Sequence, residues 1–491
     1  MKVTVTSVNL FNQSLPALVI FVFQNERFPA PASLKAMLRR LHPKELDASE
    51  NQLLLLHTAG KAGVRPARVL LVGLGKATDF NSEKLRRATG LALKKLRDAG
   101  IENAAARINP ETPEAAAAVA EAAVLALYKF TEFKPPTDAV ALRSLTICVS
   151  PKADLPAIKK AVHRAQLIAE ASNYARSIGN LPGNVVYPAT LADRARALTD
   201  ECGLKCTVLD KKALEKGGFG GLLAVGGGSA REPHLIVLEY HGSGKNQKPV
   251  ALVGKAITFD TGGISLKHAE RMDEMKFDKC GGCAVLGILR GAAQLKLPVN
   301  LLGVIAAAEN MPGANSYRPG DIVTSYRGKD ARGLTIEVLN TDAEGRIVLG
   351  DALAYARERD PLAIIDFATL TGACVVALGN FAAGLFGNDP ALIEKLRAAG
   401  EHTGERAWPM PLWQDYRELI KSEVADQKNQ GPRSAGAITA AGFLARYVGD
   451  VPWAHFDIAG TGWTTEERPY LGKGATGYGV RLVLDALGNW S

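Results

Sequence analysis

Residues 338–356 place four polar side chains directly before a run that predicts a buried helix. The stretch reads VLNTDAEGRIVLGDALAYA, and its polar members of interest are Asn340, Asp342, Glu344 and Arg346. Because Asp342 and Glu344 are two residues apart, both point to one side of an extended chain and can share a site. No histidine occurs between residues 269 and 401. Metal chemistry here would therefore depend on carboxylates.

A second group of charged residues lies in residues 253–285, VGKAITFDTGGISLKHAERMDEMKFDKCGGCAV. The pattern predicts a strand that runs into a glycine turn, followed by an apolar helix. The charged residues that matter are Lys255, Asp260, Lys267 and Asp278. Taken singly, Asp278 has an ordinary explanation as a helix N-cap, Asp260 as a turn former and Lys267 as a surface lysine.

Taken together, the two segments indicate a metal site. Asp260, Asp278, Asp342 and Glu344 lie at the ends of predicted strands or the starts of predicted helices. Such positions converge at the carboxyl edge of an α/β sheet. Four carboxylates there would repel one another, and one or two divalent cations would remove the repulsion. An oxygen-only set suits Mn²⁺, Mg²⁺ or Zn²⁺, and the sequence has no H-E-x-x-H motif.

Two such cations would support hydrolysis. Metal ions about 3.5–4 Å apart can share a water, lower its pKa and polarise the bond that it attacks. Lys267 would then suit a developing oxyanion. The planar guanidinium of Arg346 suits a carboxylate or carbonate anion, and a salt bridge to a neighbouring carboxylate would also explain it.

Four motifs carry a resemblance to a known family. They are VGKAITFDTGGISLK (253–267), MDEMKFD (272–278), NTDAEGR (340–346) and ATLTGA (368–373). Together they closely resemble the two-metal leucine aminopeptidase family, also called the cytosol aminopeptidase family. The resemblance runs from LPGNVVYPATLA, which starts at residue 181, to the end of the chain. The N-terminal third is similar only in its general α/β character.

The resemblance implies a set of metal ligands. Asp260 and Glu344 would contact both of two divalent ions, Mn²⁺ or Zn²⁺. Asp278 and Lys255 would complete one site, and Asp342 would complete the other. A lysine amine binds metal only when it is deprotonated, so the adjacent dications must lower the pKa of Lys255.

The resemblance also implies the catalytic residues, the substrate and the assembly. Lys267 and Arg346 would be catalytic, with a bicarbonate on Arg346 as the proton acceptor. The free α-amino group of a peptide would bind one metal, so the enzyme would be an exopeptidase. The resemblance also implies a homohexamer. The residues that match the family's side-chain pocket are Met275, Thr369, Gly372 and Ala459. An apolar pocket with a methionine favours leucine or other apolar residues, and Gly462 would make it roomier.

The remaining sequence predicts an α/β protein of two domains. At 491 residues the chain exceeds what one core usually serves. We expect a smaller, basic N-terminal α/β domain at 1–163 that serves oligomerisation or regulation. A long helix would join it to a larger catalytic domain at 164–491, which has a central mixed sheet flanked by helices. No apolar run reaches the ~18 residues of a membrane span, and six cysteines are too few for a disulfide scaffold. A cytoplasmic protein is therefore expected.

The net charge of +9 comes from the N-terminal third. Residues 1–163 hold 23 Lys+Arg and 14 Asp+Glu, which leaves 36 of each for the rest. Much of the excess lies on one predicted helix, SEKLRRATGLALKKLRDAG. This helix is expected to direct a stripe of six cations toward solvent: Lys84, Arg86, Arg87, Lys94, Lys95 and Arg97. Such a stripe is either a solvated face or a nucleic-acid-binding surface. A regulatory role in nucleic-acid binding is thus the alternative function, and it is compatible with peptidase activity.

Two further features of the sequence need an interpretation of their own: a long connection and a pair of cysteines. The connection SYRGKDARGLTIEV (325–338) is longer than usual and adds Asp330 and Arg332, so it could alter access or a subunit contact. Cys280 and Cys283 form a C-x-x-C next to Asp278, which is compatible with redox chemistry or zinc. Because they begin an apolar helix, we interpret them as packing residues.

Overall fold

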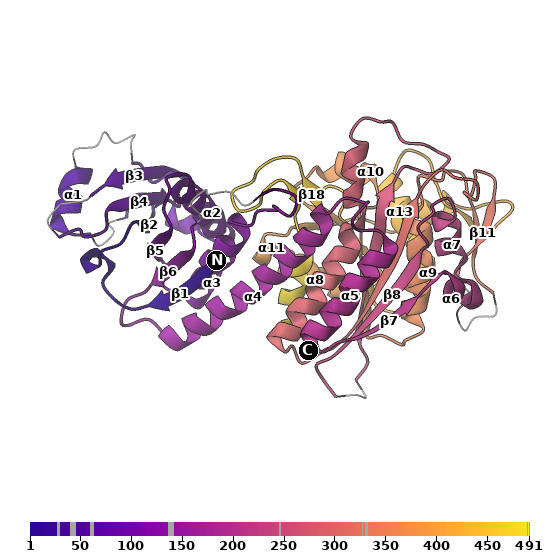
Figure 1. Cartoon of the computed structure of the whole chain (residues 1–491), viewed down its shortest axis with the longest axis horizontal. Coiled ribbons are helices and arrows are strands. Elements are labelled where there is room, and N and C mark those ends of the chain that lie inside the picture. The colour runs from indigo at the N-terminus through magenta and orange to yellow at the C-terminus, as the bar shows by residue number, and fades with distance from the viewer. Residues whose placement is uncertain are drawn as a thin grey trace. The chain divides into compact units, whose positions relative to one another are not determined.

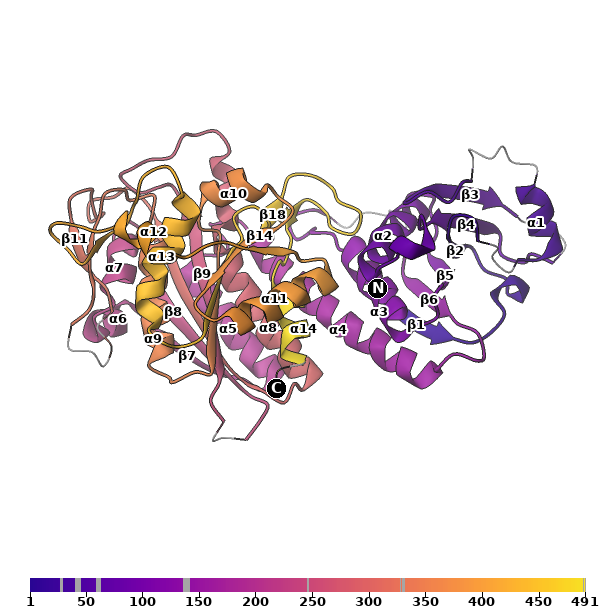
Figure 2. The ribbon, with the colours of Figure 1, turned by 180° about the vertical axis from the view of Figure 1, so that it is seen from behind.

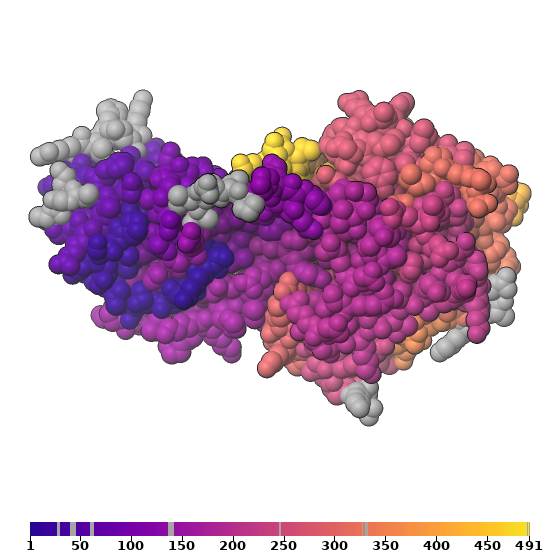
Figure 3. Space-filling view, in the orientation of Figure 1, coloured from indigo at the N-terminus to yellow at the C-terminus, as the bar shows by residue number. Residues whose placement is uncertain are grey.

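The computed structural model describes residues 1–26, 30–39, 46–58, 63–135, 142–244, 247–326, 328, 332–488 and 490, which are coloured in Figure 3. The chain forms two compact units. Unit 1 comprises Met1–Glu170 and Glu466–Gly472, and unit 2 comprises Ala171–Thr465 and Lys473–Ser491. The division falls inside α4 (Leu155–Asn180), the long helix that was expected to join the domains. The inclusion of 466–472 in unit 1 was not expected.

Unit 1 is built on a six-stranded sheet in the order β1-β6-β5-β2-β4-β3. Its strands are β1 (Lys2–Thr6), β2 (Leu18–Val22), β3 (Leu53–His57), β4 (Arg68–Gly73), β5 (Asn103–Arg107) and β6 (Ser144–Cys148). All neighbours pair in parallel except β3 and β4. The LVIFV run of β2 is buried along its whole length, as expected for a parallel strand that is covered on both faces.

Helices cover both faces of this sheet. Residues of α2 (Ser82–Asp98) and α3 (Pro113–Ala126) pack on one face, and α1 (Ala32–Leu38) contributes Leu34 to the core on the other. Asn81 begins α2 by accepting a hydrogen bond from the backbone of Lys84. Thr112 caps α3 in the same way, and proline at the first position suits a helix start.

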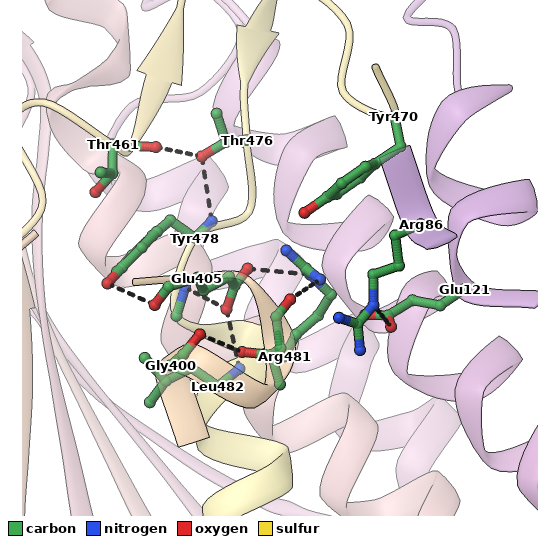
Figure 4. Close-up of polar contacts among 12 residues, drawn as sticks. Arg86, Glu121, Gly400, Glu405, Thr461, Tyr470, Thr476, Tyr478, Arg481 and Leu482 are labelled. Atoms are coloured by element: carbon green, nitrogen blue, oxygen red, sulfur yellow. Dashed lines mark hydrogen bonds and ion pairs between the residues drawn. The ribbon is translucent and has the colours of Figure 1, made fainter. Parts of the chain in front are cut away.

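The basic stripe predicted on α2 is largely neutralised, and the prediction is wrong for Arg86. The Arg86 side chain is buried, and its Nε lies 2.7 Å from Glu121 Oε2 on α3 (Figure 4). Three further cations pair with acidic residues: Lys84 with Glu50, Lys94 with Glu467 and Arg97 with Asp98. Arg87 and Lys95 remain as the exposed cations of the predicted set.

The segment Glu466–Gly472 is held in unit 1 by α2. Lys94 Nζ lies 3.1 Å from a carboxylate oxygen of Glu467 and donates to the backbone oxygen of Arg468. The hydroxyl of Tyr470 donates a hydrogen bond to the carboxylate of Glu83, which is also on α2. A short stretch from the C-terminal part of the sequence thus completes the N-terminal unit.

Unit 2 is built on an eight-stranded mixed sheet in the order β15-β14-β17-β13-β9-β10-β8-β7. Its strands are β7 (Lys205–Leu209), β8 (His234–His241), β9 (Val250–Asp260), β10 (Asn300–Asn310), β13 (Ala363–Ala368), β14 (Ala383–Gly387), β15 (Ala407–Pro409) and β17 (Trp453–Asp457). Small strands lie at β11 (Ile322–Thr324), β12 (Thr335–Glu337), β16 (Gln427–Lys428), β18 (Trp463–Thr464) and β19 (Gly474–Ala475). The mixed sheet agrees with the sequence prediction.

Helices flank both faces of this sheet, as Figures 1 and 2 show. One side carries α5 (Pro188–Cys202), α8 (Cys280–Leu295), α11 (Pro390–Thr403) and α14 (Val480–Gly488). The other side carries α7 (Gly220–Gly226), α9 (Gly345–Arg357) and α13 (Gly436–Val448). The shorter helices are α6 (Lys211–Gly217), α10 (Gly372–Leu378) and α12 (Gln414–Glu418). None of the helices, within the residues described, is long and apolar enough to cross a membrane.

A buried ion pair fixes the C-terminal helix. Glu405 accepts hydrogen bonds from the backbone of Gly479 and Leu482 and lies 3.3 Å from Arg481 Nε (Figure 4). These contacts satisfy backbone N–H groups at the start of α14. The N–H groups of a first helical turn have no acceptor within the helix.

The connection 325–338 is described in part, and Asp330 lies outside the described residues. Arg332 lies 3.0 Å from Asp426, which also accepts hydrogen bonds from the backbone and hydroxyl of Thr335. The end of this connection is therefore tied to the segment that precedes β16.

The parallel strands β9, β10, β13 and β17 end at one edge of the sheet. In the pairing register, Asp260 at the end of β9 lies opposite Asn310 at the end of β10, and Ala368 at the end of β13 lies opposite Asp457 at the end of β17. The helices α8 and α9 begin beside this edge. The predicted site residues therefore come together where the topology requires.

Candidate active site

A cavity of about 640 Å³ lies at the carboxyl edge of the large sheet. All the residues predicted from the sequence to act in the site line it, with the exception of Arg346. They are Lys255, Asp260, Lys267, Met275, Asp278, Asp342, Glu344, Thr369, Gly372 and Ala459.

Three buried carboxylates form the centre of the site. Asp260 ends β9, Asp278 lies in the 3₁₀ turn Met272–Lys279 before α8, and Glu344 immediately precedes α9. One oxygen from each lies within 4.8 Å of the others. Hard oxygen donors at this spacing suit a divalent cation.

Lys255 rises from the middle of β9 into this group. Its Nζ lies 2.9 Å from Asp278 Oδ2 and 2.9 Å from Glu344 Oε1, and it donates to the backbone oxygen of Thr369. Although burial lowers the pKa of Lys255, the carboxylates of Asp278, Glu344 and Asp260 raise it above its ordinary value. Without a metal, the ammonium group therefore supplies the positive charge that the carboxylates need.

Lys267 neutralises the other side of the cluster. Its Nζ lies 2.8 Å from Asp260 Oδ2 and contacts Asp342 Oδ1. Although burial lowers the pKa of Lys267, the neighbouring carboxylates of Asp260, Glu344 and Asp342 raise it. Asp342 is the most accessible acid of the group, with 32% of its side chain exposed.

The carboxylates fit a metal better than they fit the two lysines alone. Glu344 Oε2 is buried without a hydrogen-bond partner among the described residues. Burial and the nearby charge of Asp260 raise the pKa of Glu344 above its ordinary value. A buried carboxylate oxygen with no partner is costly, and a bound cation would satisfy it.

Arg346 lies in the first turn of α9 beside a second, smaller cavity of about 200 Å³. The two cavities share Asp342, Leu370, Thr371 and Gly372. Burial lowers the pKa of Arg346 to about 10. Its Nε has no hydrogen-bond partner in the described part of the chain, and no ion pair holds it there. The salt bridge considered from the sequence is therefore absent among these residues, and the guanidinium is available to an anion.

Two residues that support the site were not predicted from the sequence. Asp457 accepts hydrogen bonds from the backbone of Leu370, Thr371 and Ala459, and from the Thr371 hydroxyl at 2.6 Å. It thereby fixes the loop after β13. From the same loop, Thr369 Oγ1 donates to Asp278 Oδ1 at 2.6 Å. The signal that could have identified Asp457 is its place as the last residue of a buried strand.

Asn310 is the second supporting residue. Its Nδ2 donates to Asp260 Oδ1 at 2.9 Å and to the backbone oxygen of Thr341. These bonds orient one carboxylate and connect it to the chain that carries Asp342. Hydrogen bonds of this kind commonly orient metal ligands.

Gly462 does not line the main cavity. It borders a void of about 10 Å³ together with Cys280 and Cys283. A Cβ at this position would lie 3.2 Å from Thr369 Cγ2, so a larger residue would press on the loop after β13. The glycine thus contributes space behind the pocket wall.

The C-x-x-C cysteines are packing residues. Cys280 and Cys283 are buried free thiols at the start of α8. Burial raises the pKa of Cys283 to about 11 and that of Cys280 well above its ordinary value. Protonated, inaccessible thiols of this kind are unreactive.

Comparisons with known proteins decide the family. The sequence model of the catalytic domain of the cytosol aminopeptidase family matches residues 173–484, more than half of the chain. The model of the family's N-terminal domain matches residues 19–137. The chain belongs to the cytosol aminopeptidase family. The N-terminal third is thus also a family domain, which corrects the expectation that it was similar only in general character.

Relatives of this aminopeptidase match along most of their length. A probable cytosol aminopeptidase of Roseiflexus castenholzii is 46% identical, and the match covers 100% of both chains. One of Cenarchaeum symbiosum is 49% identical over 86% of each. A mutant tomato leucine aminopeptidase has a similar structure, with a TM-score of 0.88, 31% identity and coverage of 100% of this chain and 96% of that one.

A fourth relative was solved with a metal. The bottromycin maturation enzyme BotP in complex with Mn has a TM-score of 0.85 and 33% identity, with coverage of 97% of this chain and 99% of that one. The family membership makes this protein a metal-dependent aminopeptidase that acts on peptides.

Proposed function

We propose that this aminopeptidase holds two divalent metal ions per chain. Asp260 and Glu344 would bridge them, Asp278 and Lys255 would complete one site, and Asp342 would complete the other. The observation that carries the proposal is the convergence of three buried carboxylates whose oxygens lie within 4.8 Å. The unpartnered Oε2 of Glu344 supports it. Lys255 would bind as a neutral amine, which requires the ions to displace its proton.

The residues of the chain have distinct parts in this proposal. When bound, the two ions would lower the pKa of a water and polarise the peptide carbonyl. The Lys267 ammonium would stabilise the oxyanion that develops on that carbonyl. Arg346 would hold a bicarbonate that accepts the proton, because its Nε is buried without a partner among the described residues and Arg346 lines a cavity of about 200 Å³.

The proposed substrates are peptides with a free α-amino group and an apolar first residue, leucine foremost. Met275, Thr369, Gly372 and Ala459 would contact that side chain, since all four line the main cavity. The metal would be Mn²⁺ or Zn²⁺. The manganese of the bottromycin maturation enzyme supports the first of these.

The protein is further proposed to act in the cytoplasm as a homohexamer. The names of its relatives support the location. Exposed apolar side chains on unit 2 are compatible with the assembly, since Phe381 is 80% exposed and Trp413 63%. Single exposed apolar groups are common on protein surfaces, so the proposal of a hexamer rests mainly on the family.

Nucleic-acid binding through α2 is a weaker second candidate. Of the six cations expected, two are exposed and form no ion pair with any described residue, so few phosphate contacts are available. A titration of DNA at two salt concentrations tests it, with Arg87→Gln/Lys95→Gln as the variant. Binding that weakens in salt and is lost in the variant would support this role, whereas no binding at low salt would exclude it.

The experiment that tests the main proposal is metal reconstitution. The protein is stripped with a chelator, and hydrolysis of a leucyl substrate is followed while Mn²⁺ or Zn²⁺ is added. Recovery of activity by added metal supports the proposal, whereas full activity in the stripped protein would contradict it.

A further inference from the structure

Unit 1 contains a separate cavity of about 700 Å³. It lies where three adjacent parallel strands, β1, β6 and β5, end. Residues 7–9 follow β1, residues 149–151 follow β6, and Arg107 is the last residue of β5; all of them line the cavity. Ligands of open parallel sheets bind at this carboxyl edge.

The floor of the cavity is apolar. Leu10, Phe11, Leu18 and Cys148 line it, and all four belong to the core cluster on the α1 face of the sheet. The polar residues Ser7, Asn12 and Ser150 are also among the lining residues. A concave apolar surface with a few polar groups is typical of a small-molecule site, and the volume is within the usual range of about 300–1,000 Å³.

Three charged side chains border the cavity: Lys35 on α1, Arg107, and Glu111 in the connection from β5 to α3. None of them forms an ion pair or a side-chain hydrogen bond within the described ranges. Arg107 and Glu111 are close in sequence and share the cavity, yet they do not pair. A ligand that carries both charges would pair with both groups, because neither Arg107 nor Glu111 has a charged partner among the described residues.

We propose that this cavity binds a zwitterion of the amino-acid or short-peptide class. The ligand's carboxylate would contact Arg107 and Lys35, its ammonium would contact Glu111, and its apolar side chain would lie over Leu10, Phe11 and Leu18. A simple anion such as phosphate fits less well, since it would face the carboxylate of Glu111. The peptidase reaction releases molecules of the proposed class, so the site would respond to its product.

The test uses the full chain with Glu344→Gln, which slows hydrolysis during the measurement. L-Leucine, leucyl-leucine, N-acetylleucine, leucinamide and inorganic phosphate are added separately, and hydrogen–deuterium exchange is followed by mass spectrometry. Leucine or leucyl-leucine should slow exchange in residues 7–12, 107–111 and 148–151. N-Acetylleucine and leucinamide, which each lack one charge, should bind at least about tenfold more weakly. The leucine and dipeptide arms distinguish a free amino acid from a peptide.

Variants of the cavity locate the effect. Arg107→Gln and Glu111→Gln should each weaken the protection of these segments about tenfold while leaving catalysis in the otherwise unaltered enzyme unchanged. Arg87→Gln removes an equivalent charge from the exposed face of α2 and should leave the protection intact. No protection of these segments by either zwitterion would overturn the proposal. Equal protection by phosphate that strengthens in Glu111→Gln would also overturn it, in favour of an anion site.

Discussion

Lys255 Nζ lies 2.9 Å from both Asp278 and Glu344. Asp278 lies in the turn before α8, and Glu344 immediately precedes α9. The Lys255 ammonium thus pairs with two of the four acids of the cluster, and Lys267 pairs with the other two. A metal-bound enzyme would need the same nitrogen as a neutral amine. The same residues can therefore exist as an ion-pair cluster or as a ligand set, and bound metal would decide between them.

The first prediction concerns Glu344. Glu344→Gln should reduce turnover by at least about a hundredfold and weaken metal binding, because the proposed bridging charge is lost. Both effects are measured by kinetics and by metal content after dialysis. Glu423→Gln, at an exposed position of the same unit, is the matched control and should leave both unchanged. A Glu344→Gln enzyme that keeps half its activity with two metals bound would refute the bridging role.

The second prediction concerns Lys267. Lys267→Ala should lower kcat by roughly 10²–10³-fold with a smaller change in KM, if the ammonium acts on the developing oxyanion. Steady-state kinetics with a leucyl substrate give both constants. Lys473→Ala removes an exposed lysine of the same unit as a control. A large rise in KM with kcat preserved would instead make Lys267 a substrate-binding group.

The third prediction concerns Asp457, which contacts no proposed ligand directly. Asp457→Asn should weaken metal binding about 10–100-fold, because the loop that brings Thr369 to Asp278 loses its anchor. Thr371→Val removes one hydrogen bond of this anchor, together with the hydroxyl that accepts from the backbone of Cys374 at the start of α10, and should weaken metal binding less than Asp457→Asn does. Calorimetric titration of Mn²⁺ measures both variants. Asp450→Asn, on the surface before β17, serves as the control. Unchanged metal affinity in Asp457→Asn would show that the loop after β13 keeps its position without this anchor.

The fourth prediction concerns pH and a buried pair in the same sheet. His455 Nδ1 lies 2.6 Å from Asp366, and Asp457 and Arg346 are also near. Although burial lowers the pKa of His455, the charge of Asp366 raises it above the ordinary 6.5. The folded state therefore holds a proton that the unfolded chain releases. This contribution to stability is complete below pH 6.5 and is lost as pH rises through the raised pKa.

Calorimetry of the metal-free protein across this range tests the point. The Tm of the wild type should fall as pH rises past the raised pKa, and His455→Gln should flatten that part of the profile. His57→Gln, which removes an exposed histidine, should leave the profile unchanged. Identical profiles for wild type and His455→Gln would show that His455 is neutral in the folded state.

The placement of the acidic cluster was predictable from the sequence because it follows from topology. Asp260, Asp278 and Glu344 adjoin long apolar runs, and parallel strands bring such positions to one edge. The anchor Asp457 was less visible, since FDIAGTGW reads as an ordinary strand end. Its role depends on the pairing of β17 with β13, which the local pattern does not specify.

Side-chain partners from distant elements were not predictable. The period of α2 placed Arg86 on the outside, but Glu121 of α3 lies against it and the pair is buried. Lys94 likewise forms an ion pair with Glu467, which lies far along the chain in the segment that completes unit 1. Periodicity identifies the apolar face of a helix, whereas the partners of its charged residues depend on tertiary packing.

Two metal ions bound to the carboxylate cluster would drive the removal of an N-terminal residue that has a free α-amine. The most direct test adds Mn²⁺ stepwise to stripped protein and follows, in parallel, metal bound per chain and hydrolysis of a leucyl peptide and its N-acetylated counterpart. Activity on the free peptide should rise to its maximum as two ions bind per chain, and the acetylated peptide should not be cleaved. Full activity before any metal binds, or equal cleavage of the two peptides, would contradict this mechanism.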